Sequence, residues 1–172
     1  MSDSVFDLEF AKYYDKGYNV HPIKGGTKIP GFWNQATGRA ELLTGWAHPD
    51  REVPKPPQPN CGIGILLGLQ QNGIILTALD WDDDEIANAA LERFPAAISK
   101  WGKRGFTAFY RCAEPITSRK FSVDGKCMAE LLCAGKQTVL PLSIHPETGN
   151  PYVWERYSLT DVPPNELPEL AL

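Results

Sequence analysis

An apolar segment that ends in closely spaced acids constrains the fold of this chain most strongly. Residues 74–79 have the composition of a buried β-strand and lead directly into Asp80-Trp81-Asp82. Side chains two positions apart on a strand share one face, so the two aspartates are expected side by side, with their Cα atoms roughly 6 to 7 Å apart. The pattern alone leaves two interpretations open, a metal site and a solvated turn or helix cap.

A third carboxylate of interest is Glu130, which lies inside the apolar segment 128–133. A charge in such a strand is costly when it is buried alone, so Glu130 must face solvent, pair with a cation or bind a metal ion. Spacing alone supports the outward-facing and the metal-binding interpretations of Glu130 equally. Glu130 taken together with Asp80 and Asp82 favours a metal site.

Short strands alternate with turns along the chain, which predicts an α+β domain. Strands are expected at residues 18–23, 62–67, 74–79, 106–111, 128–133, 137–140 and 152–154. Two hairpins are expected, the first joining 62–67 to 74–79 and the second joining 128–133 to 137–140. Because short turns connect the strands, the sheet should be largely antiparallel, with helices on one side.

Helices are expected over residues 4–16, 39–46 and 84–94. Asp3 or Ser4 can cap the first, and Pro95 ends the last. Asp83, Asp84 and Glu85 are interpreted as solvated charges at the start of a helix. The density of prolines over residues 48–60 predicts an irregular surface loop.

The composition bounds the domain count and the partners. A chain of 172 residues with 42% apolar residues fits one globular domain. Its net charge of −4 is unusual for a protein that binds nucleic acid. Five of the 21 acids are concentrated in Asp80, Asp82, Asp83, Asp84 and Glu85, however, so the rest of the surface is nearly balanced by 17 Lys and Arg residues. Charge alone therefore does not decide the partner.

The cysteines and the hydropathy pattern give further expectations. Cys61, Cys112, Cys127 and Cys133 form no C-x-x-C pair and are expected to be buried thiols. The sequence has no apolar run of about 18 residues and no basic leader, so neither a membrane span nor a secretory signal is predicted. A cytoplasmic location is expected.

Two segments carry groups that suit an anionic triphosphate. Residues 101–107 place two cations between glycines ahead of a strand, and residues 135–146 add a cation, a hydroxyl and an imidazole. The candidate nucleotide-binding residues are Lys103, Arg104, Gly105, Thr107, Lys136, Ser143 and His145. The alternative for the first segment is an ordinary exposed turn. His21 and His48 are assigned no role.

Several motifs occur in a specific order. They are Lys28-Ile29-Pro30, Asp80-Trp81-Asp82, the strand over residues 104–110, Met128-Ala129-Glu130-Leu131 and the stretch 138–154. This order resembles the bifunctional DNA primase-polymerase domain, a family of the archaeo-eukaryotic primase superfamily that is common in phages and plasmids. The resemblance covers roughly residues 8–157, and its most specific part is the stretch 141–154.

The resemblance implies a two-lobed archaeo-eukaryotic primase fold, α+β, with a mostly antiparallel or mixed sheet and a catalytic core like an RNA-recognition motif. By position, Asp80 and Asp82 correspond to the first acidic motif and Glu130 to the third, as ligands of two Mg²⁺ or Mn²⁺ ions. The implied activity is template-dependent nucleotidyl transfer during replication of a phage, plasmid or other mobile element. The implied partners are a single-stranded DNA template, ribo- or deoxynucleoside triphosphates and a replicative helicase.

Two positions depart from the family pattern. The second motif often has a histidine that contacts the nucleotide phosphates, whereas Thr107 stands near that place here. The usual Pro-Pro-Ser is Pro141-Leu142-Ser143, which should alter a turn and not the chemistry. Two other functions therefore stay open, a metal-dependent nuclease and a nucleic-acid-binding module that has lost catalysis.

The expected domain organisation is a catalytic domain over residues 1–160 and a Pro-rich tail or linker start over residues 161–172, because Pro163, Pro164 and Pro168 fall there. In relatives this domain often precedes a helicase. The chain is thus expected to be either a fragment of a longer protein or a free-standing unit. It is expected in a bacterial host cell or encoded by a phage.

Overall fold

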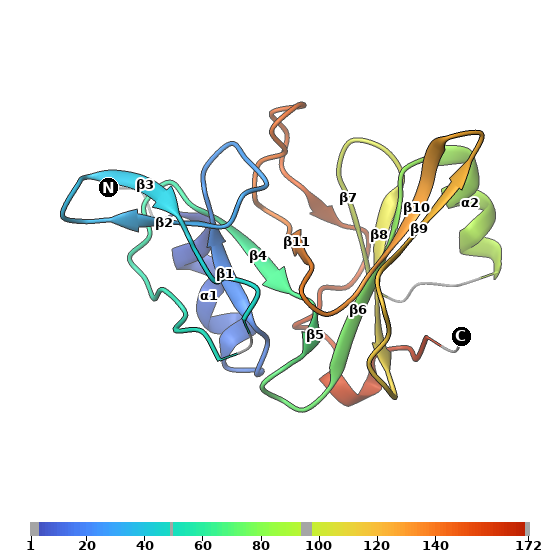
Figure 1. Cartoon of the computed structure of the whole chain (residues 1–172), viewed down its shortest axis with the longest axis horizontal. Coiled ribbons are helices and arrows are strands. Elements are labelled where there is room, and N and C mark those ends of the chain that lie inside the picture. The colour runs from blue at the N-terminus through green and yellow to red at the C-terminus, as the bar shows by residue number, and fades with distance from the viewer. Residues whose placement is uncertain (1–3, 49, 94–97, 171–172) are drawn as a thin grey trace.

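In a computed structural model of the chain, residues 4–48, 50–93 and 98–170 are described, and they form an α+β structure (Figure 1). The helices are α1 (Val5–Tyr14), α2 (Asp84–Arg93) and the 3-10 helix η1 (Pro164–Glu166). The strands are β1 (Val20–Ile23), β2 (Gly31–Asn34), β3 (Arg39–Leu42), β4 (Gly62–Leu66), β5 (Gly68–Leu69), β6 (Ile75–Trp81), β7 (Ser99–Trp101), β8 (Phe106–Cys112), β9 (Arg119–Val123), β10 (Lys126–Leu132), β11 (Gln137–Val139) and β12 (Val153–Trp154). The predicted α+β class is confirmed.

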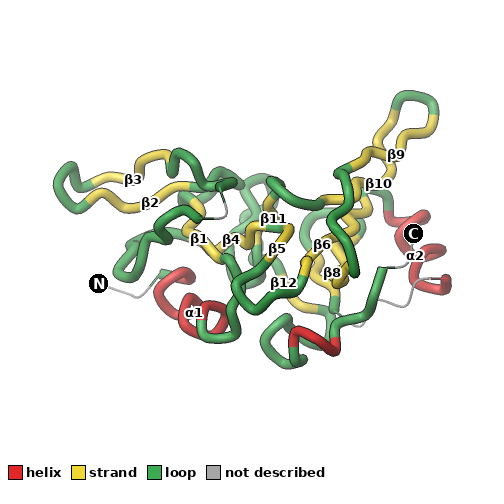
Figure 2. Tube along the Cα trace, turned by 60° about the horizontal axis from the view of Figure 1, so that its bottom comes forward, coloured by secondary structure: helices red, strands yellow, loops and turns green. Residues whose placement is uncertain are grey.

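The strands are divided between two main sheets. The small sheet has the order β1-β4-β11, and the large sheet has the order β12-β7-β8-β6-β10-β9, with β5 also paired to β6. All of these pairings are antiparallel, as predicted. A separate hairpin, β2–β3, extends from one end of the molecule, and the β9–β10 hairpin extends from the other (Figure 2).

Neither predicted hairpin joins the strands expected, because the chain changes sheets within each of them. Across the first turn only the short β5 pairs with β6. β4 pairs with β1 and β11 in the small sheet, whereas β6 and β10 pair with each other in the large one. The two crossings touch, since the Leu67 amide donates to the Lys136 carbonyl (2.8 Å) and a Cβ on Gly68 would lie 2.9 Å from the Ala134 Cα. A continuously apolar strand such as β4 has no alternation that would specify its partner.

The predicted helix over residues 39–46 is also wrong. Residues 39–42 form β3, which pairs with β2 across a turn that contains Gly38 at φ +65°. Because the turn places β3 beside β2, residues 39–42 pair as a strand and do not begin a helix. The predicted proline-rich loop is confirmed, because residues 48 and 50–60 include neither helix nor strand; Pro49 lies outside the described residues.

The other two predicted helices are confirmed. The Ser4 hydroxyl caps α1 by accepting the Asp7 amide (3.1 Å), and the Asp83 carboxylate caps α2 by accepting the Glu85 amide (3.1 Å). The interpretation of the charges at residues 83–85 as part of a helix start therefore holds for Asp83. Asp3, Phe94 and Pro95, which were expected at helix ends, lie outside the described residues.

The two faces of the large sheet differ. Leu79 and Trp81 of β6 pack with Ala87 of α2 on one face. Leu76 and Ala78 project from the opposite face into the main core, which also includes α1 and the small sheet. Because side chains alternate along a strand, Asp80 and Asp82 continue the second face beyond the point where the core ends. Figure 1 accordingly has α2 on the outer side of the large sheet, away from the small sheet.

The C-terminal segment packs on the large sheet through residue 170. Leu159 and Leu167 are buried, and the Arg111 amide of β8 donates to the Pro168 carbonyl (2.9 Å).

Cys61, Cys112 and Cys133 are buried, whereas Cys127 is half-buried. None of the helices in the described part of the chain has the length and apolar character needed to cross a membrane.

Candidate active site

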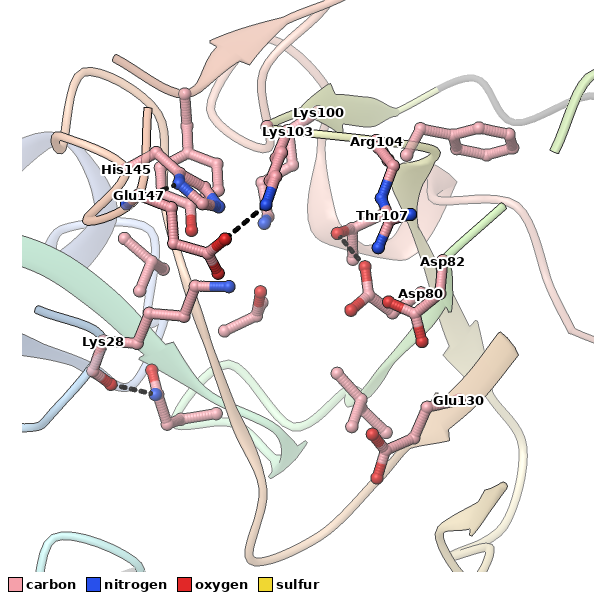
Figure 3. A pocket seen from close by; sticks show the side chains of 17 residues that line it. Lys28, Asp80, Asp82, Lys100, Lys103, Arg104, Thr107, Glu130, His145 and Glu147 are labelled. Carbon is pink, nitrogen blue, oxygen red and sulfur yellow. Dashed lines mark hydrogen bonds and ion pairs between the residues drawn. The ribbon is translucent and has the colours of Figure 1, made fainter. Parts of the chain in front are cut away.

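A cavity of about 330 Å³ lies between the small and large sheets (Figure 3). Its lining includes Lys28, Gln137, Thr138 and Val139 from the side of the small sheet. From the large sheet come Asp80, Asp82, Lys100, Thr107, Glu130 and Leu132, and the connecting segments add Gly102, Lys103, Arg104, His145, Glu147 and Tyr152. The cavity thus brings together most of the residues that the sequence singled out.

Strand register explains how residues far apart in the sequence meet here. Asp80 of β6 is the direct neighbour of Glu130 on β10 and of Thr107 on β8, and Thr107 is the neighbour of Lys100 on β7. Directly opposed residues of an antiparallel pair point to the same face. Four strands therefore present a row of Lys100, Thr107, Asp80 and Glu130 to the cavity, with Asp82 two positions beyond Asp80.

The three acids have the donor chemistry of a site for a hard divalent cation, which prefers carboxylate oxygens. Figure 3 shows Asp80 and Asp82 close together and the Glu130 carboxylate turned away from them. In these conformers no three acidic, histidine or cysteine side chains of the described residues are gathered tightly enough to hold a metal ion. Cross-strand neighbours have Cβ atoms only about 5 Å apart, so rotation of the Glu130 side chain would complete the set. The residues fit the metal in chemistry and backbone position.

Thr107 is bound to one of these acids. Its hydroxyl donates to Oδ1 of Asp80 at 2.5 Å. The side chain that stands where relatives often have a phosphate-binding histidine therefore holds an aspartate in place.

Lys100 is the most buried cation of the site, and sequence reasoning missed it. The residue is 4% exposed, and its ammonium lies 4.6 Å from the centre of the Tyr152 ring. Burial lowers the pKa of Lys100 to about 8, with a further lowering by Lys28, while Asp80 opposes the shift. The sequence shows only a lysine between Ile98 and Trp101. This stretch is too short for the alternation of a strand to be recognised, so nothing indicated that Lys100 would be buried.

His145 lines the cavity as a neutral imidazole. Its ring lies 5.1 Å from the Tyr152 ring, and its Nδ1 accepts the Glu147 amide at 3.2 Å. Burial, followed by the nearby Lys28, lowers the pKa of His145 below its usual value, which favours the uncharged form at neutral pH. With Nδ1 as an acceptor, the proton of the neutral ring is on Nε2, which can donate to a ligand.

The two cations predicted from residues 101–107 line the cavity. Lys103 forms an ion pair with Glu147, and both side chains are largely exposed. Arg104 extends toward Asp80 and Asp82 in Figure 3.

Three predicted nucleotide-binding residues are not among those lining the cavity. The Gly105 amide donates to Asp84 (2.6 Å), and a Cβ at this φ of +57° would lie 1.8 Å from the Trp81 carbonyl oxygen, so a glycine is required here for close backbone approach. The Ser143 hydroxyl accepts the Ile63 amide (2.8 Å). The Lys136 side chain is exposed at the crossing between the sheets.

Comparison with known families identifies the chain. The family of bifunctional DNA primase/polymerase N-terminal domains matches residues 10–170, nearly the whole length. This chain belongs to that family. A search of curated proteins found no match. Family membership confirms the resemblance seen in the sequence, and it indicates a nucleotidyltransferase-type enzyme.

Proposed function

We propose that this chain carries out template-dependent nucleotidyl transfer, as a DNA primase, a DNA polymerase or both. The observation that carries the proposal is the division of charge within one cavity. Asp80, Asp82 and Glu130 are on one side, and the cations Lys28, Lys100, Lys103 and Arg104 surround the rest. A nucleoside triphosphate that is bound for transfer needs both, because the reacting phosphate takes metal-ligating carboxylates and the leaving phosphates take cations.

In this proposal, Asp80, Asp82 and Glu130 hold two Mg²⁺ or Mn²⁺ ions. Bound ions of this kind lower the pKa of an attacking hydroxyl and neutralise charge on the phosphates. Thr107 keeps Asp80 in the orientation that faces the cavity, through its 2.5 Å hydrogen bond. Glu130 must turn from its present direction to take part.

The reaction forms one P–O bond and breaks another, and the attacking 3′ hydroxyl loses its proton to water. The 3′ oxygen of a primer or initiating nucleotide bonds to the α-phosphorus, the bond from that phosphorus to the bridging oxygen breaks, and pyrophosphate leaves. Lys103 and Arg104 neutralise the phosphates of the incoming nucleotide. The neutral His145 donates from Nε2 to a phosphate oxygen. A single-stranded DNA template occupies the open side of the cavity.

We further propose that the two sheets correspond to the two lobes of the archaeo-eukaryotic primase fold, with the large sheet as the lobe that resembles an RNA-recognition motif. The support is that α2 covers one face of this sheet while the acids occupy the other. Replication of a phage, plasmid or other mobile element in the cytoplasm of a bacterial host, together with a replicative helicase, follows from the resemblance alone.

A primer-extension and de novo priming assay with ribo- and deoxynucleotides, in Mg²⁺ and in Mn²⁺, tests the proposal. The wild-type chain should extend or begin strands, whereas Asp80→Ala should not. A metal-dependent nuclease would instead shorten the labelled strand and gain no heat stability from nucleotides. A binding module without catalysis would retain the template and leave the primer unchanged.

A further inference from the structure

Lys100 lacks a partner that would justify its burial. Its ammonium takes part in no hydrogen bond or ion pair with any residue that the structure describes. Asp80, the acid that acts on it electrostatically, already accepts a hydrogen bond from Thr107 and lies beyond ion-pair distance of Lys100. The contact with the Tyr152 ring is favourable but weaker than the hydration that a buried ammonium gives up. A buried cation that faces a cavity without a partner indicates an anionic ligand.

Lys28 approaches the same space from the opposite side. It belongs to the loop between β1 and β2, and its backbone carbonyl accepts the Gln137 side-chain amide at 2.9 Å. Because Gln137 begins β11, this bond ties the Lys28 loop to the small sheet. The positive charge of Lys28 acts on both Lys100 and His145, so the cations repel one another across the cavity while it holds no anion.

The other cations of the cavity are partly committed. Lys103 is neutralised by its ion pair with Glu147, and Arg104 is directed at the aspartates. The side-chain amide of Gln137 is likewise committed, because it donates to the Lys28 carbonyl at 2.9 Å. An anionic ligand should therefore be stabilised most between Lys28 and Lys100, on the boundary between the two sheets.

We propose that Lys28 and Lys100 form a clamp that binds the phosphate chain of the incoming nucleotide and joins the small sheet to the large one. The identity of the anion rests on the proposed function. Binding of the phosphate chain requires neither catalysis nor metal, since both ligands are ammonium groups that donate charge-assisted hydrogen bonds. In this clamp, Lys100 contributes more than Lys103 to the affinity for the phosphate chain.

Inorganic tripolyphosphate in the presence of EDTA is the probe, because it has the phosphate chain without base, sugar or metal. Titration calorimetry would compare the wild-type chain with Lys100→Met, Lys28→Met, the double variant and Lys55→Met, an exposed lysine outside the cavity. Each clamp variant should bind about tenfold more weakly, as expected for a lost charged hydrogen bond. Lys55→Met should bind as the wild type does.

Two features of the result separate a clamp from general charge attraction. The double variant should lose less than the product of the single losses, because the second lysine binds poorly once the anion is no longer held from both sides. Lys100→Met should also raise the melting temperature of the anion-free protein while it abolishes the rise produced by tripolyphosphate. Lys28→Met, at an exposed position, serves as the variant whose folding is not in question.

The outcomes for the clamp and for the proposed function are distinguishable. Unchanged tripolyphosphate affinity in Lys100→Met and Lys28→Met would overturn the clamp, as would a wild-type chain that does not bind tripolyphosphate. If the wild type extends primers and both variants retain its KM for nucleotides, the clamp fails while the proposed function stands. If both variants lose tripolyphosphate binding but the wild type makes no strand, the clamp stands and the proposed function fails.

Discussion

The two sheets bring different chemistry to the cavity that they enclose. The large sheet supplies Asp80, Asp82 and Glu130, whereas no acid of the described small-sheet strands lines the cavity, and the loop joined to that sheet contributes Lys28. In the proposed function, the acids of the large sheet act on the reacting phosphorus, whereas Lys28, on the loop joined to the small sheet, acts with Lys100 on the phosphate chain. Mutations of the acids and of Lys28 should therefore affect different steps.

The largest effect is expected in the large sheet, from Asp80→Ala or Asp82→Ala. Either change should abolish strand synthesis, because the two carboxylates form the closest pair of the candidate metal site. Without metal, the melting temperature should stay the same or rise, since repulsion between the acids is relieved. Primer extension and thermal unfolding measure the two effects, with the exposed Asp50→Ala as a control. Polymerisation by both variants at saturating Mn²⁺ would remove the metal role of these acids.

The placement of the two aspartates was predictable because it depends on local spacing. Alternation along β6 places Asp80 and Asp82 on one face, and caps at Ser4 and Asp83 start the helices where the sequence indicates. Such features need only a few neighbouring residues. The α+β class follows in the same way from the alternation of short strands and turns with a few helical segments.

Features that depend on long-range pairing were not predictable. β4 and β11 are apolar enough to fit either sheet, so nothing in their residues indicated that the chain crosses between sheets. The role of Lys100 depends on the β7–β8 register, which is set by contacts across the sheet. Gly105 and Ser143 looked like ligand-binding residues, but their polar groups are used to hold the backbone.

Glu130→Gln tests whether the third acid acts together with the two aspartates. If Glu130 turns to bind metal, the rate should collapse and the Mn²⁺ requirement should rise sharply, because the charge is lost while the volume is kept. The free energy of unfolding should change by no more than about 0.5 kcal/mol, since Glu130 forms no ion pair with the described residues. Measurements of the melting temperature and of the Mn²⁺ dependence of primer extension test these two expectations. Unchanged activity and metal dependence would mean that another group is the third ligand.

Lys103→Ala and Arg104→Ala should have smaller effects, on nucleotide affinity more than on template affinity. Because Lys103 is already paired with Glu147 and is largely exposed, its loss should cost a few-fold in affinity, less than the loss of Lys100. Titration of labelled nucleotide and of labelled single strand would separate the two ligands. Equal losses in both titrations would assign these residues to the template path.

The smallest effect is expected inside the small sheet, where His21 is 0% exposed and remote from the acids in sequence and sheet. Burial, followed by the charge of Arg51, lowers the pKa of His21 to about 3, against about 6.5 in an unfolded chain. Between these values the unfolded state binds a proton that the folded state does not, so stability is lost as the pH falls. The slope cannot exceed about 1.4 kcal/mol per pH unit.

His21→Gln removes this titration while it keeps an amide near Arg51, whose guanidinium lies 3.2 Å from Nδ1 of the native ring. Urea unfolding of the two proteins between pH 6.5 and 5, where most carboxylates stay ionised, should give a shallower loss of stability with falling pH in the variant. Strand synthesis at pH 7.5 should depend little on the change, because His21 does not line the cavity. Equal slopes in both proteins would mean that the folded small sheet accepts a proton at His21. The chemical contrast between the two sheets would then weaken, because the small sheet would hold a positive charge in its interior.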